Sequence, residues 1–109
     1  MNTLLRYETH NDSDIDVNGT SYQGVITETF ENLLKVFGTL MGASDDGKVD
    51  VEWNIMFNDG VVATIYNWKN GPASMGSNGT NPVNIKTWHI GGKTISAMID
   101  VEEILKNNA

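Results

Sequence analysis

Residues 49–68, with the sequence VDVEWNIMFNDGVVATIYNW, decide the fold. From Val49 to Phe57 every second side chain is apolar, and most of those between are polar. This period of two is typical of a strand with one buried face and one solvent-exposed face. The run Asn58-Asp59-Gly60 is typical of a tight hairpin turn, and the apolar segment 61–68 returns from it. The sequence therefore predicts an antiparallel hairpin at the centre of a sheet.

Helical periodicity lies on both sides of this hairpin. In residues 28–38 large apolar side chains recur at helical spacing, with Thr27 as the expected N-cap and Gly38 as the expected end. Residues 94–106 carry a broad apolar stripe, which predicts a second helix packed on the sheet. Residues 70–84 are rich in glycine, proline and asparagine, so we expect an exposed loop there.

Further strands are expected in the N-terminal part of the chain and before the last helix. The pair Asn18-Gly19 predicts a hairpin turn that joins residues 15–17 to a returning strand at 21–26. Strands are also expected at 4–9 and 85–90. These patterns together predict a single α+β domain over residues 1–109, with two helices and an antiparallel sheet of about four to six strands.

The charge balance narrows the classes of function. With 14 acidic and 7 basic side chains, the formal net charge is −7, which disfavours direct binding to nucleic-acid backbones. The absence of cysteine excludes disulfides, thiol catalysis and thiolate zinc sites. No apolar run has the length of a membrane span, and the first residues lack a signal-peptide pattern. We therefore expect a soluble intracellular protein without membrane contact.

An acidic run precedes the predicted Asn18-Gly19 turn. Asp14, Asp16 and Asn18 alternate as the first ligands of a calcium loop do, but Val25 stands where that loop needs a bidentate glutamate. The intervening apolar residues fit a strand of the predicted hairpin. The pattern therefore favours an acidic surface hairpin over a calcium site, and we expect neither a metal nor a cofactor.

The segment 87–94, TWHIGGKT, ends in a run that is common in phosphate-binding loops. A nucleotide-hydrolysing P-loop needs a glycine where Thr87 stands, and the chain has no room for the parallel core around such a loop. Gly91, Gly92 and Lys93 can instead bind a phosphate passively if the glycine amides lie at the start of the last helix. The alternative is that the glycines only turn the chain from strand into helix, with Lys93 in solvent.

Aromatic and basic residues gather in two segments. Tyr66, Trp68 and Lys69 end one predicted strand, while Trp88 and His89 lie in another. If these ends are adjacent, a base can stack on an indole while lysines contact phosphates. Alternatively, the aromatic side chains of the strands belong to the core. The candidate ligand-binding residues are Tyr66, Trp68, Lys69, Trp88, His89, Gly91, Gly92 and Lys93.

Several segments together are similar to a recurring pattern. They are residues 18–24 (NGTSYQG), 30–38, 46–49 (DGKV) with 52–53 (EW), 59–69 (DGVVATIYNWK) and 88–93 (WHIGGK). On these segments the chain resembles a family of small, largely uncharacterised bacteriophage proteins. It departs from that pattern after Gly38, where a proline is expected, and at Asn67, where aspartate is common. The resemblance implies a viral protein that acts in the host cytoplasm.

Two hypotheses of function follow, and neither is catalytic, because two histidines and no cysteine leave few nucleophile–base pairs. In the first, the candidate residues sequester a nucleotide-type signal used in host defence, at a pocket that a homo-oligomer can complete. In the second, an acidic surface mimics phosphates and blocks a host nucleic-acid-binding or defence enzyme. That surface consists of Asp12, Asp14, Asp16, Asp45, Asp46, Asp50 and Glu52. A minor virion or assembly component is a third class, for which the sequence carries no distinguishing pattern.

Overall fold

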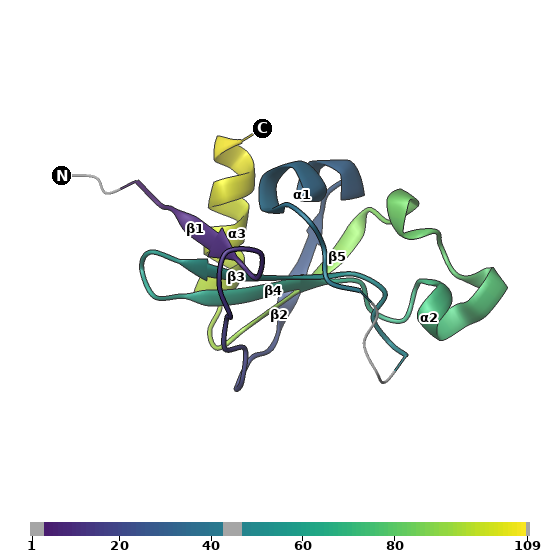
Figure 1. Ribbon diagram of the computed structural model, residues 1–109. Helices are drawn as coiled ribbons and strands as arrows, with labels where there is room; N and C mark the ends of the chain where they lie inside the picture. Colours follow the sequence, from purple (N-terminus) through teal and green to yellow (C-terminus); the bar gives the residue numbers. More distant parts are fainter. Residues whose placement is uncertain (1–3, 43–46, 109) are drawn as a thin grey trace.

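A five-stranded antiparallel sheet with helices on one face forms a single α+β domain, as the sequence predicts. The computed structural model describes residues 4–42 and 47–108 (Figure 1). The strands, in the spatial order β1-β3-β4-β5-β2, are β1 (Tyr7–Thr9), β2 (Ser21–Thr27), β3 (Glu52–Phe57), β4 (Val62–Tyr66) and β5 (Thr87–Gly92). The helices are α1 (Phe30–Phe37), α2 (Pro72–Met75) and α3 (Ser96–Asn107), with the 3₁₀ turns η1 (Gly76–Asn78) and η2 (Pro82–Asn84).

The predicted hairpin of residues 49–68 is present as β3 and β4. Trp53 pairs with Ile65 and Ile55 pairs with Ala63, and all four side chains are buried under the helices. Both strands are shorter than predicted, since β3 begins at Glu52 and β4 spans only Val62–Tyr66. β4 occupies the middle of the sheet, between β3 and β5.

Both long helices cover the same face of the sheet (Figure 1). α1 buries Leu33 and Phe37, which are four residues apart and therefore share one helical face. α3 buries Ala97, Val101 and Ile104 against β4 and β5. Full burial of a large apolar side chain contributes about 1.5–3 kcal/mol, so this face supplies most of the stabilisation of the fold.

The predicted hairpin at Asn18-Gly19 is wrong. β2 pairs with β5, and residues 15–17 lie outside the strands. A turn still forms, since Thr20 N–H bonds the Val17 carbonyl at 3.2 Å and Asn18 N–H bonds the Asp16 carboxylate at 2.9 Å. Turn residues predict a change of direction, but the strand partner is selected by the open edge of β5.

Several element ends differ from the predicted ones, and β5 lies two residues later than the predicted strand at 85–90. The N-cap of α1 is Thr29, whose hydroxyl accepts a hydrogen bond from Asn32 N–H, and not Thr27, which belongs to β2. The first strand spans only Tyr7–Thr9, and α3 begins at Ser96. Gly38 does end α1, with a positive φ of 82° that suits glycine. In the described part of the chain, no helix is long and apolar enough to cross a membrane.

Candidate aromatic binding site

The face of the sheet opposite the helices carries an aromatic surface. Tyr66 and His89 face each other across β4 and β5, while Tyr22 is paired with Gly91 across β2 and β5. A β-bulge between Tyr22 and Gly24 shifts the register there, so that Tyr22 shares this face with Val25, three positions later. Without the bulge, strand alternation would turn Tyr22 toward α3.

Four rings form what we call the aromatic cluster: Tyr22, Tyr66, Trp68 and His89. The ring centroid of His89 lies 5.0 Å from that of Tyr22, 5.6 Å from that of Tyr66 and 6.4 Å from that of Trp68. The His89 and Trp68 rings are stacked, whereas Tyr66 and Trp68 meet edge to face. The four rings line a cavity of about 320 Å³. Trp68 is 38% exposed and Tyr22 is 58% exposed, so both offer ring surface to a ligand.

Two lysines lie over the Trp68 ring. The Nζ atoms of Lys48 and Lys69 are 5.7 Å and 5.5 Å from its centroid, within the range of cation–π attraction. Lys69 has a φ of 57°, the one positive value at a non-glycine residue of the described chain. Its N–H bonds the Lys48 carbonyl at 2.8 Å, which holds the two segments together beside the indole. This left-handed backbone therefore places a cation at the aromatic cluster.

A groove of about 290 Å³ continues from the aromatic cluster and contains Glu52. Glu52 pairs with Tyr66 across β3 and β4, and both residues line the groove with Trp68. Burial raises the pKa of the Glu52 carboxyl. Burial and, to a smaller extent, the nearby Glu52 charge raise the pKa of Tyr66. No residue in the described part of the chain donates a hydrogen bond to the Glu52 carboxylate. The site thus combines an unpaired acceptor, stacked rings and two ammonium groups.

His89 contributes a ring rather than a charge. Burial lowers the pKa of His89 from the ordinary value of 6.5, which favours the neutral imidazole. A neutral ring can stack on a ligand without repelling a neighbouring ammonium group.

The predicted site residues separate into two groups. Tyr66, Trp68, Lys69 and His89 lie together on the open face, and Gly91 lines the groove beside them. A Cβ atom on Gly91 would lie 2.4 Å from Thr64 Oγ1, so glycine is needed for the side chains of β4 to cover this strand.

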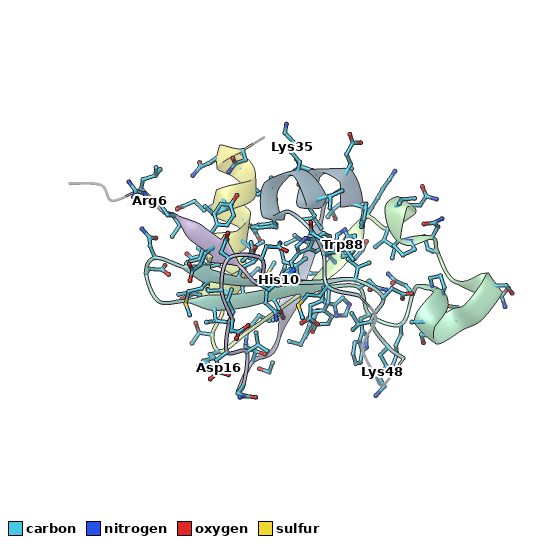
Figure 2. The ribbon with its side chains drawn as sticks, in the orientation of Figure 1. Arg6, His10, Asp16, Lys35, Lys48 and Trp88 are labelled. Carbon is cyan, nitrogen blue, oxygen red and sulfur yellow. The ribbon has the colours of Figure 1, made fainter. Side chains whose placement is uncertain are left out.

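Trp88, Gly92 and Lys93 lie elsewhere. Trp88 is fully buried on the helix side of the sheet, whereas Lys48 projects on the opposite side (Figure 2). A Cβ atom on Gly92 would lie 2.3 Å from the Ala97 Cβ atom, so this glycine lets α3 approach β5. The exposed Lys93 lies beside the turn at Gly19.

The expected anion cradle of glycine amides at the start of a helix is wrong. Gly91 and Gly92 belong to β5, and both take part in pairing with β4 on one side and β2 on the other. Strand pairing engages the backbone of these residues, which therefore is not displayed to a phosphate. Lys93, Thr94 and Ile95 separate the glycines from α3.

Sequence reasoning missed Tyr22, Lys48 and Glu52 as members of the site. A signal for Glu52 was present, because strand alternation and the hairpin turn place it opposite Tyr66. No local signal existed for Tyr22, since its position depends on the β2–β5 pairing and on the bulge.

Some carboxylates of the predicted acidic surface accept hydrogen bonds within the protein. Asp12 accepts a hydrogen bond from Thr9 N–H, and Asp50 accepts hydrogen bonds from Asn67 and from Ala73 N–H. Asp14 is exposed, and the positions 45 and 46 lie outside the described residues. Among residues 4–42 and 47–108, no group of three or more acidic, histidine or cysteine side chains could hold a metal ion.

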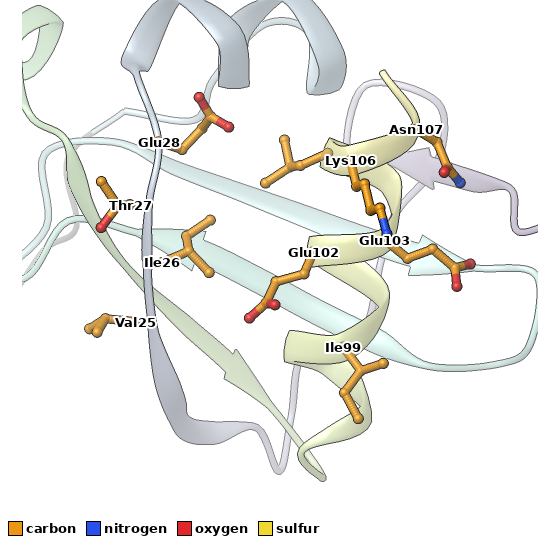
Figure 3. Close-up of a pocket in the computed structure, with 10 residues that line it drawn as sticks. Val25, Ile26, Thr27, Glu28, Ile99, Glu102, Glu103, Lys106 and Asn107 are labelled. Atoms are coloured by element: carbon orange, nitrogen blue, oxygen red, sulfur yellow. The ribbon is translucent and has the colours of Figure 1, made fainter. Parts of the chain in front are cut away.

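A larger groove of about 780 Å³ lies between β2 and α3 (Figure 3). Its charged lining is mainly acidic, since Glu28, Glu102 and Glu103 accompany Lys106. No aromatic side chain belongs to its described lining. This groove therefore lacks both the stacking surface and the excess of positive charge that a phosphorylated aromatic ligand needs, and the aromatic cluster is the better candidate site.

Comparison of the chain with protein-family models, curated proteins and solved structures finds no match in any of the three.

Proposed function

We propose that this protein is a non-catalytic binding protein for a nucleotide-type ligand, held at the aromatic cluster. The observation that carries the proposal is the exposed Trp68 ring, which stacks with His89 and lies beneath the Nζ atoms of Lys48 and Lys69. A base would stack on the rings, and the ammonium groups would contact the phosphates.

The magnitudes favour this assignment. Stacking of a base on an aromatic side chain contributes about 1–3 kcal/mol, and it is strongest where a ring face is accessible. Lysine binds phosphate as a mobile point charge. The remaining surface is acidic, with a net charge of −7 for the whole chain, which opposes the approach of a long polyanion. A small nucleotide is therefore favoured over a nucleic acid.

The proposed biological role is sequestration of a nucleotide-type signal of host defence, in the cytoplasm of a bacterial host. This setting is the one that the resemblance of residues 18–24, 59–69 and 88–93 to a family of phage proteins would imply. Sequestration requires tight binding without turnover, and an aromatic surface with flanking lysines suits that requirement.

The test is a thermal-shift titration with a panel of mono-, di- and cyclic nucleotides. A ligand that binds only the folded protein raises the Tm as its concentration increases. We expect Trp68→Ala to weaken binding by about 1–3 kcal/mol. The separate variant Lys69→Ala should also weaken binding, and its effect should be larger in low salt. Lys93→Ala is the matched control, because it removes the same charge away from the Trp68 ring, and it should bind as the parent does.

Two results would contradict the proposal. One is a Tm that no nucleotide in the panel raises. The other is equal binding by the parent protein and Trp68→Ala, with circular dichroism showing that the variant is folded.

A further inference from the structure

We infer that Glu52 gives this site a preference for guanine over the other common bases; the inference rests on the proposed nucleotide binding. The preference follows from the position of the Glu52 carboxylate beside the aromatic rings and from its lack of a hydrogen-bond donor among the described residues.

Glu52 lies at the margin of the stacking surface. It is opposite Tyr66 in the β3–β4 pair, where side chains on one face are about 4.5–5.5 Å apart at Cβ. Trp68 follows Tyr66 by two residues and lines the same groove as Glu52. A base stacked on the Trp68 ring can therefore direct one of its edges toward the Glu52 carboxylate.

The carboxylate is half-buried and has no hydrogen-bond donor among the described residues. The withdrawal of a charged group from water is unfavourable unless hydrogen bonds replace the lost hydration. The neighbouring Thr64 and Tyr66 do not bond to it, although both line the groove. A ligand that brings donors to this position would replace that hydration, whereas a ligand that brings acceptors would be repelled.

The donor pattern of the bases selects guanine. An ionised carboxylate has two oxygen atoms that only accept hydrogen bonds. Guanine presents N1–H and an N2 amino group side by side, which matches both oxygens and gives a charge-assisted bidentate pair. The edges of adenine, cytosine and uracil place an acceptor beside each donor, so one carboxylate oxygen would face a lone pair.

The experiment is isothermal titration calorimetry of the full chain with GMP, IMP and AMP, in a buffer of pH 8 that favours the ionised carboxyl. We expect GMP to bind at least about tenfold more tightly than AMP, because hydrogen bonds to charged groups are the stronger ones. IMP keeps N1–H and lacks the N2 amino group, so it should bind with intermediate affinity. Glu52→Gln should remove the preference for GMP while AMP still binds. Glu103→Gln, on α3, is the control for loss of one negative charge and should retain the preference.

The outcomes separate the inference from the proposed function. Equal binding of GMP and AMP by the parent protein, or an unchanged preference in Glu52→Gln, overturns the inference and leaves nucleotide binding intact. If none of the three nucleotides binds and the thermal-shift panel is also negative, the proposed function fails and the inference fails with it. Circular dichroism and the Tm of each variant establish that it is folded.

Discussion

Trp53 and Trp88 meet edge to face, with ring centroids 5.7 Å apart, and their indole N–H groups bond the two ends of the same helical segment. Trp53 Nε1 donates to the Gly38 carbonyl at 2.8 Å, immediately after α1, while Trp88 Nε1 donates to the Glu28 carbonyl at 2.9 Å, before it. Phe30 packs against both indoles. Two neighbouring rings from separate strands thus determine where α1 lies on the sheet.

Trp88→Phe should destabilise the protein. The substitution removes the donor of the partly buried Glu28 carbonyl and leaves space in the core, and each effect amounts to about 1–3 kcal/mol. Urea unfolding followed by circular dichroism measures the change. Trp68→Phe is the matched control at an exposed position and should change the free energy of unfolding by about 0.5 kcal/mol or less. Equal effects of the two substitutions would show that the bond to Glu28 does not hold α1.

Asn67→Asp should destabilise the protein at neutral pH by at least about 2 kcal/mol, because the second carboxylate oxygen would have no donor and would face the oxygen atoms of Asp50 and Asn70 in a buried position. The Asn67 side chain is fully buried, and its Nδ2 donates to Asp50 Oδ1 at 2.9 Å and to Asn70 Oδ1 at 3.0 Å. Its Oδ1 accepts from the N–H groups of Asp50 and Val51. An aspartate would keep the acceptor and place a second carboxylate against Asp50.

Exchange of the carboxylate of Asp50 and the amide of Asn67 tests this hydrogen-bond network. In the double variant Asp50→Asn with Asn67→Asp, the amide can again donate to the carboxylate across the contact, so part of the lost stability should return. Chemical denaturation of the parent, the two single variants and the double variant measures the coupling. Additive effects of the two substitutions would argue against a direct contact.

Gly92→Ala should destabilise the protein by about 1–3 kcal/mol through overpacking. The new Cβ atom would lie 2.3 Å from the Ala97 Cβ atom and 3.4 Å from the Val62 carbonyl oxygen, so α3 would have to move away from β5. Gly42→Ala is the control, because nothing lies within 4 Å of a Cβ atom at that position. Thermal unfolding of both variants gives the comparison, and a neutral Gly92→Ala would show that α3 is not closely held.

Asp100 makes the stability dependent on pH. Burial, a hydrogen bond to Asp59 and the charges of Asp59 and Glu103 raise the pKa of Asp100 to about 7. The same hydrogen bond lowers the pKa of Asp59 in the β3–β4 turn. Since the pKa of Asp100 exceeds its ordinary value of 3.8, its contribution to stability is fully present below that value and is lost as the pH rises through about 7.

Asp100→Asn should therefore remove this loss of stability at higher pH. An amide donates to the Asp59 carboxylate at every pH, as the protonated acid does at low pH. We expect the Tm of the parent to fall progressively between about pH 4 and about pH 7, and the variant to exceed it at pH 8 by on the order of a few degrees. At about pH 4 the two proteins should differ little. A parallel pH dependence in both proteins would contradict the shared proton.

The candidate site was only partly predictable, and the reason lies in strand alternation. Trp88 and His89 are adjacent, so they must face opposite sides of the sheet, and one of them had to leave the predicted group. The sequence does not determine which face of the sheet the helices cover. Once α1 and α3 lie over Trp88, His89 faces the open side and meets Tyr66.

The sequence by itself determined the features that depend on neighbours in the chain. The alternation through Trp53 and Phe57, the turn at Asp59-Gly60 and the end of α1 at Gly38 each follow from local periodicity or from the backbone freedom of glycine. The tertiary structure alone decided that β2 pairs with β5, that a bulge turns Tyr22 toward His89, and that the backbone of Gly91 takes part in strand pairing. Pairing between distant strands depends on which edges remain open and which faces become buried, and both are properties of the assembled sheet.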